Sequence, residues 1–436
     1  MSLLGIFVTG VTGINAQAQK LGAISDNISN ANTDGYKPTD VEFQTLVTQT
    51  DAPTIPGSTG PEPVNYAPGG VIPTPRQLVS LQGLLTSTSS NTDVAISGNG
   101  FFAVTPESSI TGSGTSATID KGATLAVTRA GSFVMDANGL LTNSAGYTLL
   151  GTPVGSTLPT SLTGLVPVAL DPGPTVTVPG SATTQVTLNG NLPATATLGS
   201  SNQLSVGVYD SAGVEYSLGI TFTNTGTNTW TAAATSLTPV NSTTGVTTTV
   251  SSTPQSLTFD SNGQLTTSTL GSLGTFTLSN GATLSPTFSF GASTSGLGLT
   301  QFGSTFANGD SQQVGGAGAG YRTGIAVTNT GVVQEIYSNG ETIPRYQLPV
   351  VTYINPQGLE PETGNVWIAT QQSGKAAINL PNTGGAGQIM PAELEQSSVD
   401  LATEFENMIV SEATYQANTK TITTANSMWQ TLTDLR

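Results

Sequence analysis

Both ends of this chain carry apolar residues at alternating spacings of three and four, the period of a helix that packs against other helices. Near the N-terminus the series is Leu4, Phe7, Val11, Ile14, Ala18, Leu21 and Ile28, interrupted only at Ser25. Near the C-terminus it is Leu401, Phe405, Met408, Tyr415, Ile422 and Trp429, with polar Glu412, Thr419 and Asn426 between them. Each end therefore presents an apolar stripe that something must cover, and we interpret these residues as an assembly seam.

The two predicted helices differ in intrinsic stability. The first contains four glycines, Gly5, Gly10, Gly13 and Gly22. Together they cost about 4 kcal/mol of helix propensity relative to alanine, so this helix forms only when its stripe is buried. The second has no Gly or Pro after Pro391 and a start signal in Ser397 and Asp400. Pairing of the two helices to close one globular domain is the simpler alternative. However, a second helix from about residue 398 to 434 would be about 55 Å long, which favours packing between subunits.

Turn and glycine signals divide the rest of the chain into nested parts. Residues 30–38 carry several signals that end the first helix and begin a turn. Residues 41–70 are typical of a proline-containing extended arm, and the Gly-rich residues 315–320 form a joint between two β-segments. Short strands fill the remainder, with a tight turn or bulge at 98–100 and a turn at 136–139 between two strands. We predict a mainly β protein with α-helical termini that pair as a coiled-coil core. The predicted domains are a terminal helical domain with its arm (1–70 and 391–436), a split β-domain (71–165 and 313–390) and an inserted β-sandwich or barrel (166–312).

The composition excludes several classes of function. The 436 residues include 26 acidic and 10 basic side chains, with no basic residue between Arg129 and Arg322, so we expect no nucleic-acid partner. The chain has no Cys and no His, which removes disulfides, zinc–thiolate sites, cysteine nucleophiles and the commonest general base. We therefore expect no metal and no cofactor.

Membrane and export signals are weak in this sequence. The apolar segment from Leu3 to Ile14 has no basic region before it, because the first lysine is Lys20. No run of about 18 apolar residues appears that could span a bilayer. We expect no membrane insertion, and export by a route that does not read a cleavable signal.

Paired carboxylates could in principle act as acid and base, and Glu360 with Glu362, or Glu404 with Glu406, are the pairs to consider. The first pair follows a turn, and we place the second on the solvent face of the C-terminal helix. Gly98-Asn99-Gly100 is not a dinucleotide fingerprint, because no helix follows it. We therefore predict that the protein is not an enzyme.

Several motifs of this sequence together indicate one family. The terminal motifs are residues 25–37 (SDNISNANTDGYK), 397–405 (SSVDLATEF) and 415–420 (YQANTK). The interior ones are 98–102 (GNGFF), 128–133 (TRAGSF) and 355–361 (NPQGLEP). Together they resemble the motifs of the bacterial flagellar rod and hook proteins, the interior ones those of the first β-domain of that family. The segment 166–312 resembles the inserted outer domain of hook members, through 222–230 and 257–263, whereas rod members look shorter.

This resemblance implies a structural subunit that crosses a narrow export channel unfolded. It then polymerises into a curved, flexible tube, a universal joint that transmits motor torque to the filament. The implied partners are further copies of the chain, the distal rod, the hook cap, the hook–filament junction proteins, the hook-length control protein and the export apparatus, at an extracellular location. Two alternatives remain open: a distal rod subunit, and a secreted β-rich adhesin or enzyme.

Overall fold

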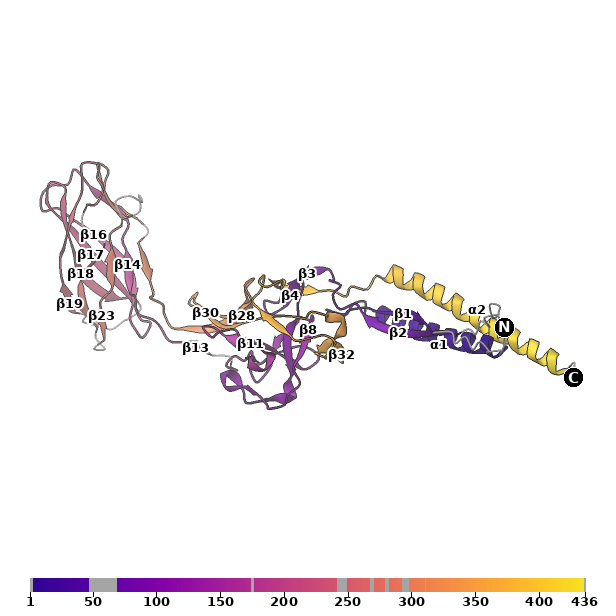
Figure 1. Ribbon diagram of the computed structural model, residues 1–436. Coiled ribbons are helices and arrows are strands. Elements are labelled where there is room, and N and C mark those ends of the chain that lie inside the picture. Colours follow the sequence, from indigo (N-terminus) through magenta and orange to yellow (C-terminus); the bar gives the residue numbers. More distant parts are fainter. Residues whose placement is uncertain are drawn as a thin grey trace, which may run out of the picture. The chain divides into compact units, whose positions relative to one another are not determined.

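The computed structural model describes residues 3–46, 69–173, 176–240, 249–266, 270–278, 282–291, 298–309 and 311–434. Figure 1 shows a mainly β chain with one long helix at each end, as the sequence predicts. The chain divides into two compact units. The first comprises Met1–Gly173, Ile325–Gln334 and Pro344–Arg436, and the second comprises Pro174–Gly324 and Glu335–Ile343. The boundaries of the three-domain division given above stay a prediction.

The terminal helices are α1 (Leu3–Ser29) and α2 (Leu401–Asp434), and they pack against each other. The predicted coiled-coil pairing of the two ends therefore occurs within one chain. The start of α2 differs from the expected position near residue 398. Asp400 Oδ1 accepts hydrogen bonds from the backbone N–H groups of Ala402 (2.9 Å) and Thr403 (3.5 Å), so Asp400 is the N-cap. Ser397 Oγ only accepts one from the N–H of Val399, ahead of the helix.

The first residues of the predicted arm form a strand that lies along α1. This strand, β1 (Thr39–Thr45), pairs in antiparallel fashion with β2 (Val71–Gln77) over the full length of both. Buried Val41 is the apolar anchor of β1. Most of the arm, residues 47–68, lies outside the described residues.

In the first unit, strands from the two ends of the chain pair with each other. Three antiparallel pairs do this: β3 (Leu85–Ser87) with β36 (Glu393–Glu395), β4 (Val94–Ser97) with β35 (Gln388–Pro391), and β8 (Ala126–Thr128) with β33 (Val366–Ile368). β8 also pairs with β5 (Phe102–Pro106), which pairs in turn with β11 (Tyr147–Pro153). The remaining strands here are β6 (Ile110–Thr111), β7 (Thr118–Ile119), β9 (Val134–Met135), β10 (Leu141–Thr142), β12 (Val166–Pro167), β31 (Val350–Thr352), β32 (Glu360–Glu362) and β34 (Ala377–Asn379).

Two glycine-containing turns of this unit have different roles. The turn at 136–139 joins the paired strands β9 and β10, as predicted, and Asp136 Oδ1 accepts hydrogen bonds from the N–H groups of Asn138 and Leu140. The 98–100 segment is not a hairpin, because β4 and β5 pair with different strands. Gly100 has φ +126°, and a Cβ there would lie 2.2 Å from Val350 Cγ1, so only glycine lets the chain pass from β4 to β5 at this point.

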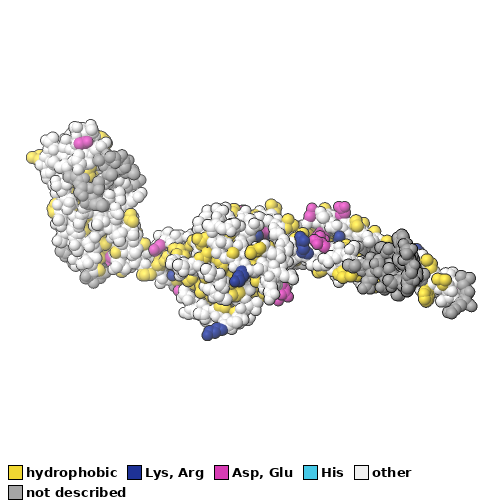
Figure 2. Space-filling model, in the orientation of Figure 1, with side chains coloured by type: hydrophobic (Ala, Val, Ile, Leu, Met, Phe, Trp, Pro, Cys, Tyr) yellow, Lys and Arg dark blue, Asp and Glu magenta, His cyan; other side chains and the backbone are white. Residues whose placement is uncertain are grey.

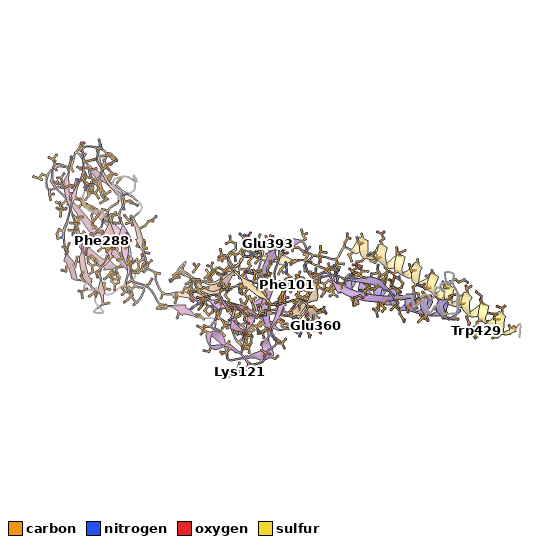
Figure 3. The ribbon with its side chains drawn as sticks, viewed as in Figure 1. Phe101, Lys121, Phe288, Glu360, Glu393 and Trp429 are labelled. Carbon is orange, nitrogen blue, oxygen red and sulfur yellow. The ribbon has the colours of Figure 1, made fainter. Side chains whose placement is uncertain are left out.

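The second unit is a set of small sheets around one apolar core that includes Phe222, Trp230, Phe276 and Phe288. Figure 3 labels Phe288 within it. Its largest sheet has the order β16 (Ser201–Tyr209), β17 (Glu215–Gly226), β18 (Thr229–Pro239) and β20 (Gln255–Thr258). Its other strands are β13 (Thr177–Val178), β14 (Gln185–Thr187), β15 (Gly190–Pro193), β19 (Thr249–Ser252), β21 (Leu270–Ser272), β22 (Gly274–Thr277), β23 (Thr283–Leu284), β24 (Thr287–Ser289), β25 (Leu299–Phe302), β26 (Ala307–Asn308) and β27 (Gln312–Val314). Strands β28 (Gly320–Val327), β29 (Val332–Tyr337) and β30 (Thr342–Gln347) complete the chain.

A candidate assembly surface at the paired termini

The contact between α1 and α2 is built on small residues. A Cβ on Gly10 would lie 2.7 Å from Ile422 Cγ1, and one on Gly13 would lie 2.8 Å from Asn418 Nδ2, so the two helices approach closely at both glycines. Ala16 of α1 is buried, as are Ser411 and Ala425 of α2. Two of the four glycines that weaken α1 as an isolated helix, Gly10 and Gly13, therefore form part of the surface on which α2 packs.

Buried Asn27 connects α1 to the arm and to α2. Its Nδ2 donates to Glu404 Oε1 (2.8 Å) and to the Thr39 carbonyl (3.0 Å), and its Oδ1 accepts from the Thr39 N–H (2.9 Å) and the Tyr36 hydroxyl (3.1 Å). Each polar atom of this amide thus has partners, as a buried side chain requires. The sequence marks Asn27 only as part of the 25–37 motif.

Glu404 does not lie on the solvent face of α2, so its predicted position is wrong. It faces α1, where it accepts the hydrogen bond from Asn27. Burial raises the pKa of Glu404, the hydrogen bond from Asn27 opposes this, and the charge of Asp40 raises it further. The pattern of apolar residues could not place Glu404, because polar residues also occupy the face of α2 that contacts α1. Glu406, by contrast, is exposed as predicted.

The large apolar side chains of the predicted seam divide into two groups. Phe7, Ile14, Leu21, Ile28, Met408 and Ile422 are half-buried. Val11, Leu401, Phe405, Tyr415 and Trp429 are exposed, Phe405 at 51% and Trp429 at 55% of their surface. The side chain of Leu4 lies outside the described residues. Figure 3 shows Trp429 near the C-terminal end of α2. Much of the predicted seam is therefore uncovered in the single chain, and its role in assembly stays a prediction.

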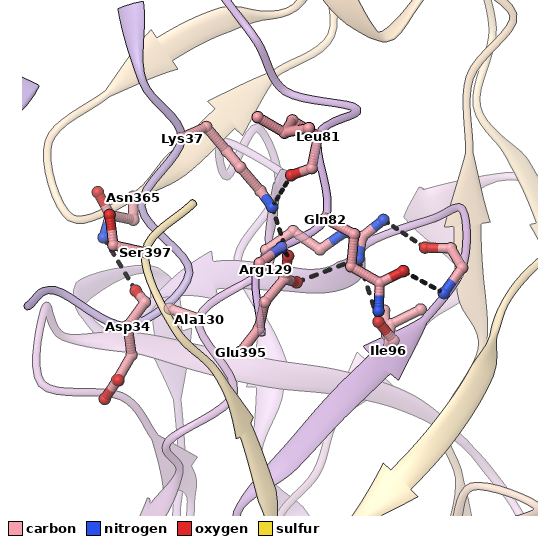
Figure 4. A network of polar contacts seen from close by, with 12 residues as sticks. Asp34, Lys37, Leu81, Gln82, Ile96, Arg129, Ala130, Asn365, Glu395 and Ser397 are labelled. Carbon is pink, nitrogen blue, oxygen red and sulfur yellow. Dashed lines mark hydrogen bonds and ion pairs between the residues drawn. The ribbon is translucent and has the colours of Figure 1, made fainter. Parts of the chain in front are cut away.

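A buried ionic network joins the 30–38 segment, the β-strands of the first unit and the segment that leads into α2 (Figure 4). Glu395 Oε1 accepts from Lys37 Nζ (2.5 Å) and from the Gly83 N–H (2.7 Å), and its Oε2 accepts from Arg129 Nη1 (3.1 Å). Lys37, Arg129 and Glu395 are all almost fully buried. Burial lowers the pKa of Lys37 and of Arg129, and the charge of Glu395 opposes that shift. The sequence signals Lys37 and Arg129 only as members of the quoted motifs, and it gives no signal for Glu395.

The other carboxylates considered as an acid–base pair are Glu360 and Glu362. Glu360 and Glu362 are exposed on β32. Within the described ranges, no three His, Cys, Asp or Glu side chains lie close enough together to hold a metal ion. Nor does any helix among these residues combine the length and apolarity needed to cross a membrane.

Three family models match separate parts of the chain. Residues 7–37 match "Flagella basal body rod protein", residues 180–315 match "Flagellar basal body protein FlaE D2 domain", and residues 391–435 match "Flagellar basal body rod FlgEFG protein C-terminal". The flagellar hook protein FlgE of Rhizobium meliloti (strain 1021) is 33% identical over the whole of both chains. The chain belongs to the flagellar hook protein family. FlgE of Escherichia coli (strain K12) is 30% identical over 99% of this chain and all of that one.

The fold agrees with this membership. The crystal structure of Helicobacter pylori flagellar hook protein FlgE2 superimposes with a TM-score of 0.50 at 15% identity, covering 71% of this chain and all of the other. The resemblance seen in the sequence is therefore confirmed, and the alternative of a distal rod subunit is not favoured. The three family matches also coincide with the terminal helices and with the second unit.

Proposed function

We propose that this chain is the structural subunit of the flagellar hook, which polymerises into a curved, flexible tube that transmits motor torque to the filament. The observation that carries the proposal is the apolar face of α2. Pairing with α1 leaves Leu401, Phe405, Tyr415 and Trp429 exposed on a helix of 34 residues. An exposed apolar stripe of this kind indicates an interface with another subunit.

Covering this face contributes favourable free energy to assembly. Full burial of a Phe, Leu or Met side chain contributes about 1.5–3 kcal/mol. Phe405 and Trp429 each expose about half of their surface, so covering both adds an increment of that order at each subunit contact. Repetition of the contact along a polymer then stabilises helices that are marginal in one chain.

The second unit suits contacts that must exchange as a hook bends. Its residues 174–321 contain no basic side chain, and Arg322 pairs with Glu335 inside the unit. On the face shown in Figure 2, few charged side chains appear among its described residues. Ion pairs between one copy of this unit and the next are therefore few, and contacts made by Thr, Ser and Gly surfaces are weak and easily exchanged.

Several finer statements belong to the same proposal. The role is structural and not enzymatic, and the location is extracellular. The proposed neighbours, besides further copies, are the distal rod, the hook cap, the hook–filament junction proteins, the hook-length control protein and the export apparatus. The family membership supports these statements.

Electron microscopy of the purified chain tests the proposal. We expect tubes that are curved, and straight rigid rods would favour the distal rod alternative. Phe405→Asp should block polymerisation, because a carboxylate would enter the contact between subunits, while the monomer should keep its α1–α2 pairing, since about half of the Phe405 side chain is already exposed to solvent. The matched control is Glu406→Gln, at the adjacent exposed position. Normal tubes from Phe405→Asp would contradict the assignment of this face.

A further inference from the structure

A groove of about 420 Å³ lies on α2 beside the N-terminal part of α1, and we call it the α2 groove. Ile6 of α1 closes one side of it. Its other lining residues all belong to α2 and are Ala417, Lys420, Thr421, Thr424, Ala425 and Met428. Of these six, all but Ala425 are exposed in the single chain. The α2 groove is therefore open to solvent and is lined mainly by small side chains.

The spacing of these residues is that of holes in a coiled coil. In such packing, a large side chain of one helix enters a hole between four residues of the next helix, at positions i, i+3, i+4 and i+7. The α2 groove contains two holes of this kind, residues 417, 420, 421 and 424, and residues 421, 424, 425 and 428. The second hole lies four positions after the first. Two large side chains four positions apart on a parallel helix can therefore fill both.

Phe405 and Ile409 of α2 are a pair with this spacing. They lie on one face of the helix, four positions apart, and expose 51% and 69% of their surface. At 3.6 residues per turn, this face is directed about 110° away from the α2 groove, and it lies about 23 Å from the groove along the helix axis. The α2 helix of one chain therefore cannot place its own Phe405 and Ile409 in its own groove.

The charges of α2 favour contact between the first half of one copy and the second half of another. Residues 401–412 contain three acidic side chains and no basic one. Lys420 is the only charged residue of the sequence from 413 to 433, and it lines the α2 groove. The groove therefore suits a helix that carries large apolar side chains between acidic ones, and residues 401–412 of another copy are such a helix.

We propose that the α2 groove of one copy receives Phe405 and Ile409 of a second copy, whose α2 runs parallel and is displaced by about 23 Å along the helix axis. The inference rests on the proposed polymerisation and specifies which surfaces meet in it. The contact joins two different surfaces, so each added copy leaves a free surface for the next one. A closed dimer would need both surfaces of one helix to face the same partner, and the angle between them prevents this. The contact therefore gives an open polymer.

Thr421→Trp tests the α2 groove, with Thr423→Trp as the matched control. Both threonines are exposed, and each hydroxyl donates to a carbonyl of its own helix, that of Ala417 or of Lys420. Thr421 lines the groove and Thr423 does not. The two variants should therefore have the same unfolding midpoint as monomers. Thr421→Trp fills the space that Phe405 would enter, so it should raise the critical concentration for tube formation about tenfold or more, whereas Thr423→Trp should leave that concentration unchanged.

Disulfide formation identifies the residues of the second copy. The chain has no cysteine, so each introduced one is unique. A minor fraction of ¹⁵N-labelled Ile409→Cys subunits is polymerised with unlabelled Thr424→Cys subunits and then oxidised. Because Thr424 belongs to the hole that Ile409 enters, we expect disulfides that join a labelled peptide to an unlabelled one, as Cα atoms within about 7 Å allow. The control pair, Ile409→Cys with Thr423→Cys, should give none.

Each failure has a distinct meaning. Equal critical concentrations for the two tryptophan variants would overturn the inference. Tubes without the disulfide between positions 409 and 424, or with an equal yield from the control pair, would also overturn it, while the tubes themselves uphold the proposed function. Failure of the unmodified chain to form tubes would overturn both.

Discussion

Removal of the charge of Glu395 should destabilise the first β-unit more than any other single loss of charge in that unit. Its carboxylate is 1% exposed and accepts from Lys37, Arg129 and the Gly83 N–H. Glu395→Gln keeps the shape but leaves two buried cations without a counter-charge. Breaking a buried ion pair in this way costs about 3–5 kcal/mol. That is a large share of the roughly 5–15 kcal/mol by which a domain is stable.

Denaturant unfolding of the monomer, followed by hydrogen exchange and mass spectrometry, measures this cost for each unit separately. Exchange should accelerate in β3, β4, β8 and β36, which surround the network, and stay unchanged in β16–β18 of the second unit. Lys37→Met in the Glu395→Gln background removes one of the stranded cations, so it should recover part of the loss.

The matched control is the ion pair between Arg76 and Glu42, at 3.1 Å between Nη1 and Oε1. These side chains are 48% and 55% exposed, so Glu42→Gln should cost less than about 1 kcal/mol. A Glu395→Gln variant that is destabilised as little as Glu42→Gln would refute the reasoning. The buried network would then contribute no more to the free energy of unfolding than a solvent-exposed ion pair.

Three further predictions concern the helices and the second unit. The raised pKa of Glu404 means that the folded chain binds the Glu404 proton more tightly than the unfolded chain, so stability falls as pH rises from the ordinary value of 4.5 through the folded pKa. Glu404→Gln should flatten this pH dependence by less than about 1 kcal/mol in thermal melts followed by circular dichroism. Glu406→Gln should leave the dependence unchanged. Gly22→Ala, with no atom within 4 Å of the new Cβ, should stabilise α1 by about 1 kcal/mol in the same melts, whereas Gly10→Ala should fall short of that gain because its Cβ meets Ile422 at 2.7 Å; equal gains would contradict the close approach of the two helices at Gly10. Replacement of 179–319 by a short Gly/Ser linker should still give polymers, straight or irregularly curved under the electron microscope, because Val178 pairs with Gly320 and the two cut ends therefore lie close together; loss of polymers with the first unit still folded would show that the second unit is needed for assembly.

The sequence predicts the elements of this fold better than their contacts. Apolar periodicity locates both helices to within a few residues, and the Asp-x-x-Gly signal locates the β9–β10 turn. The start of α2 is misplaced because Ser397 and Asp400 are both good capping residues, and only the backbone geometry decides between them. The ionic network is out of reach for local reasoning, because Lys37 and Glu395 are 358 positions apart.

The predicted seam shows why a hydrophobic pattern cannot by itself assign a contact. The strongest apolar line on α2 runs through Leu401, Phe405, Tyr415 and Trp429, but α1 packs beside that line on smaller and polar side chains. Close approach of two helices requires small residues, and a hydrophobicity scale gives small residues lower values than large apolar ones. Apolar periodicity thus identifies the residues that must be covered, whereas side-chain volume decides which of those residues the other helix of the same chain can cover.

This division between two faces has a consequence for assembly. The contact within the chain depends on the close approach at Gly10 and Gly13 and on the bond between Asn27 and Glu404, and a hydrogen bond of this kind contributes about 1 kcal/mol. The exposed face, which we propose contacts other copies, holds the large aromatic side chains Phe405, Tyr415 and Trp429, each able to contribute more than that when covered. We propose that the two helices of such a subunit separate at low cost during export. They pair again on assembly, when contact with other copies covers the exposed face of α2. Strengthening the internal contact should therefore impair export before it impairs the polymer.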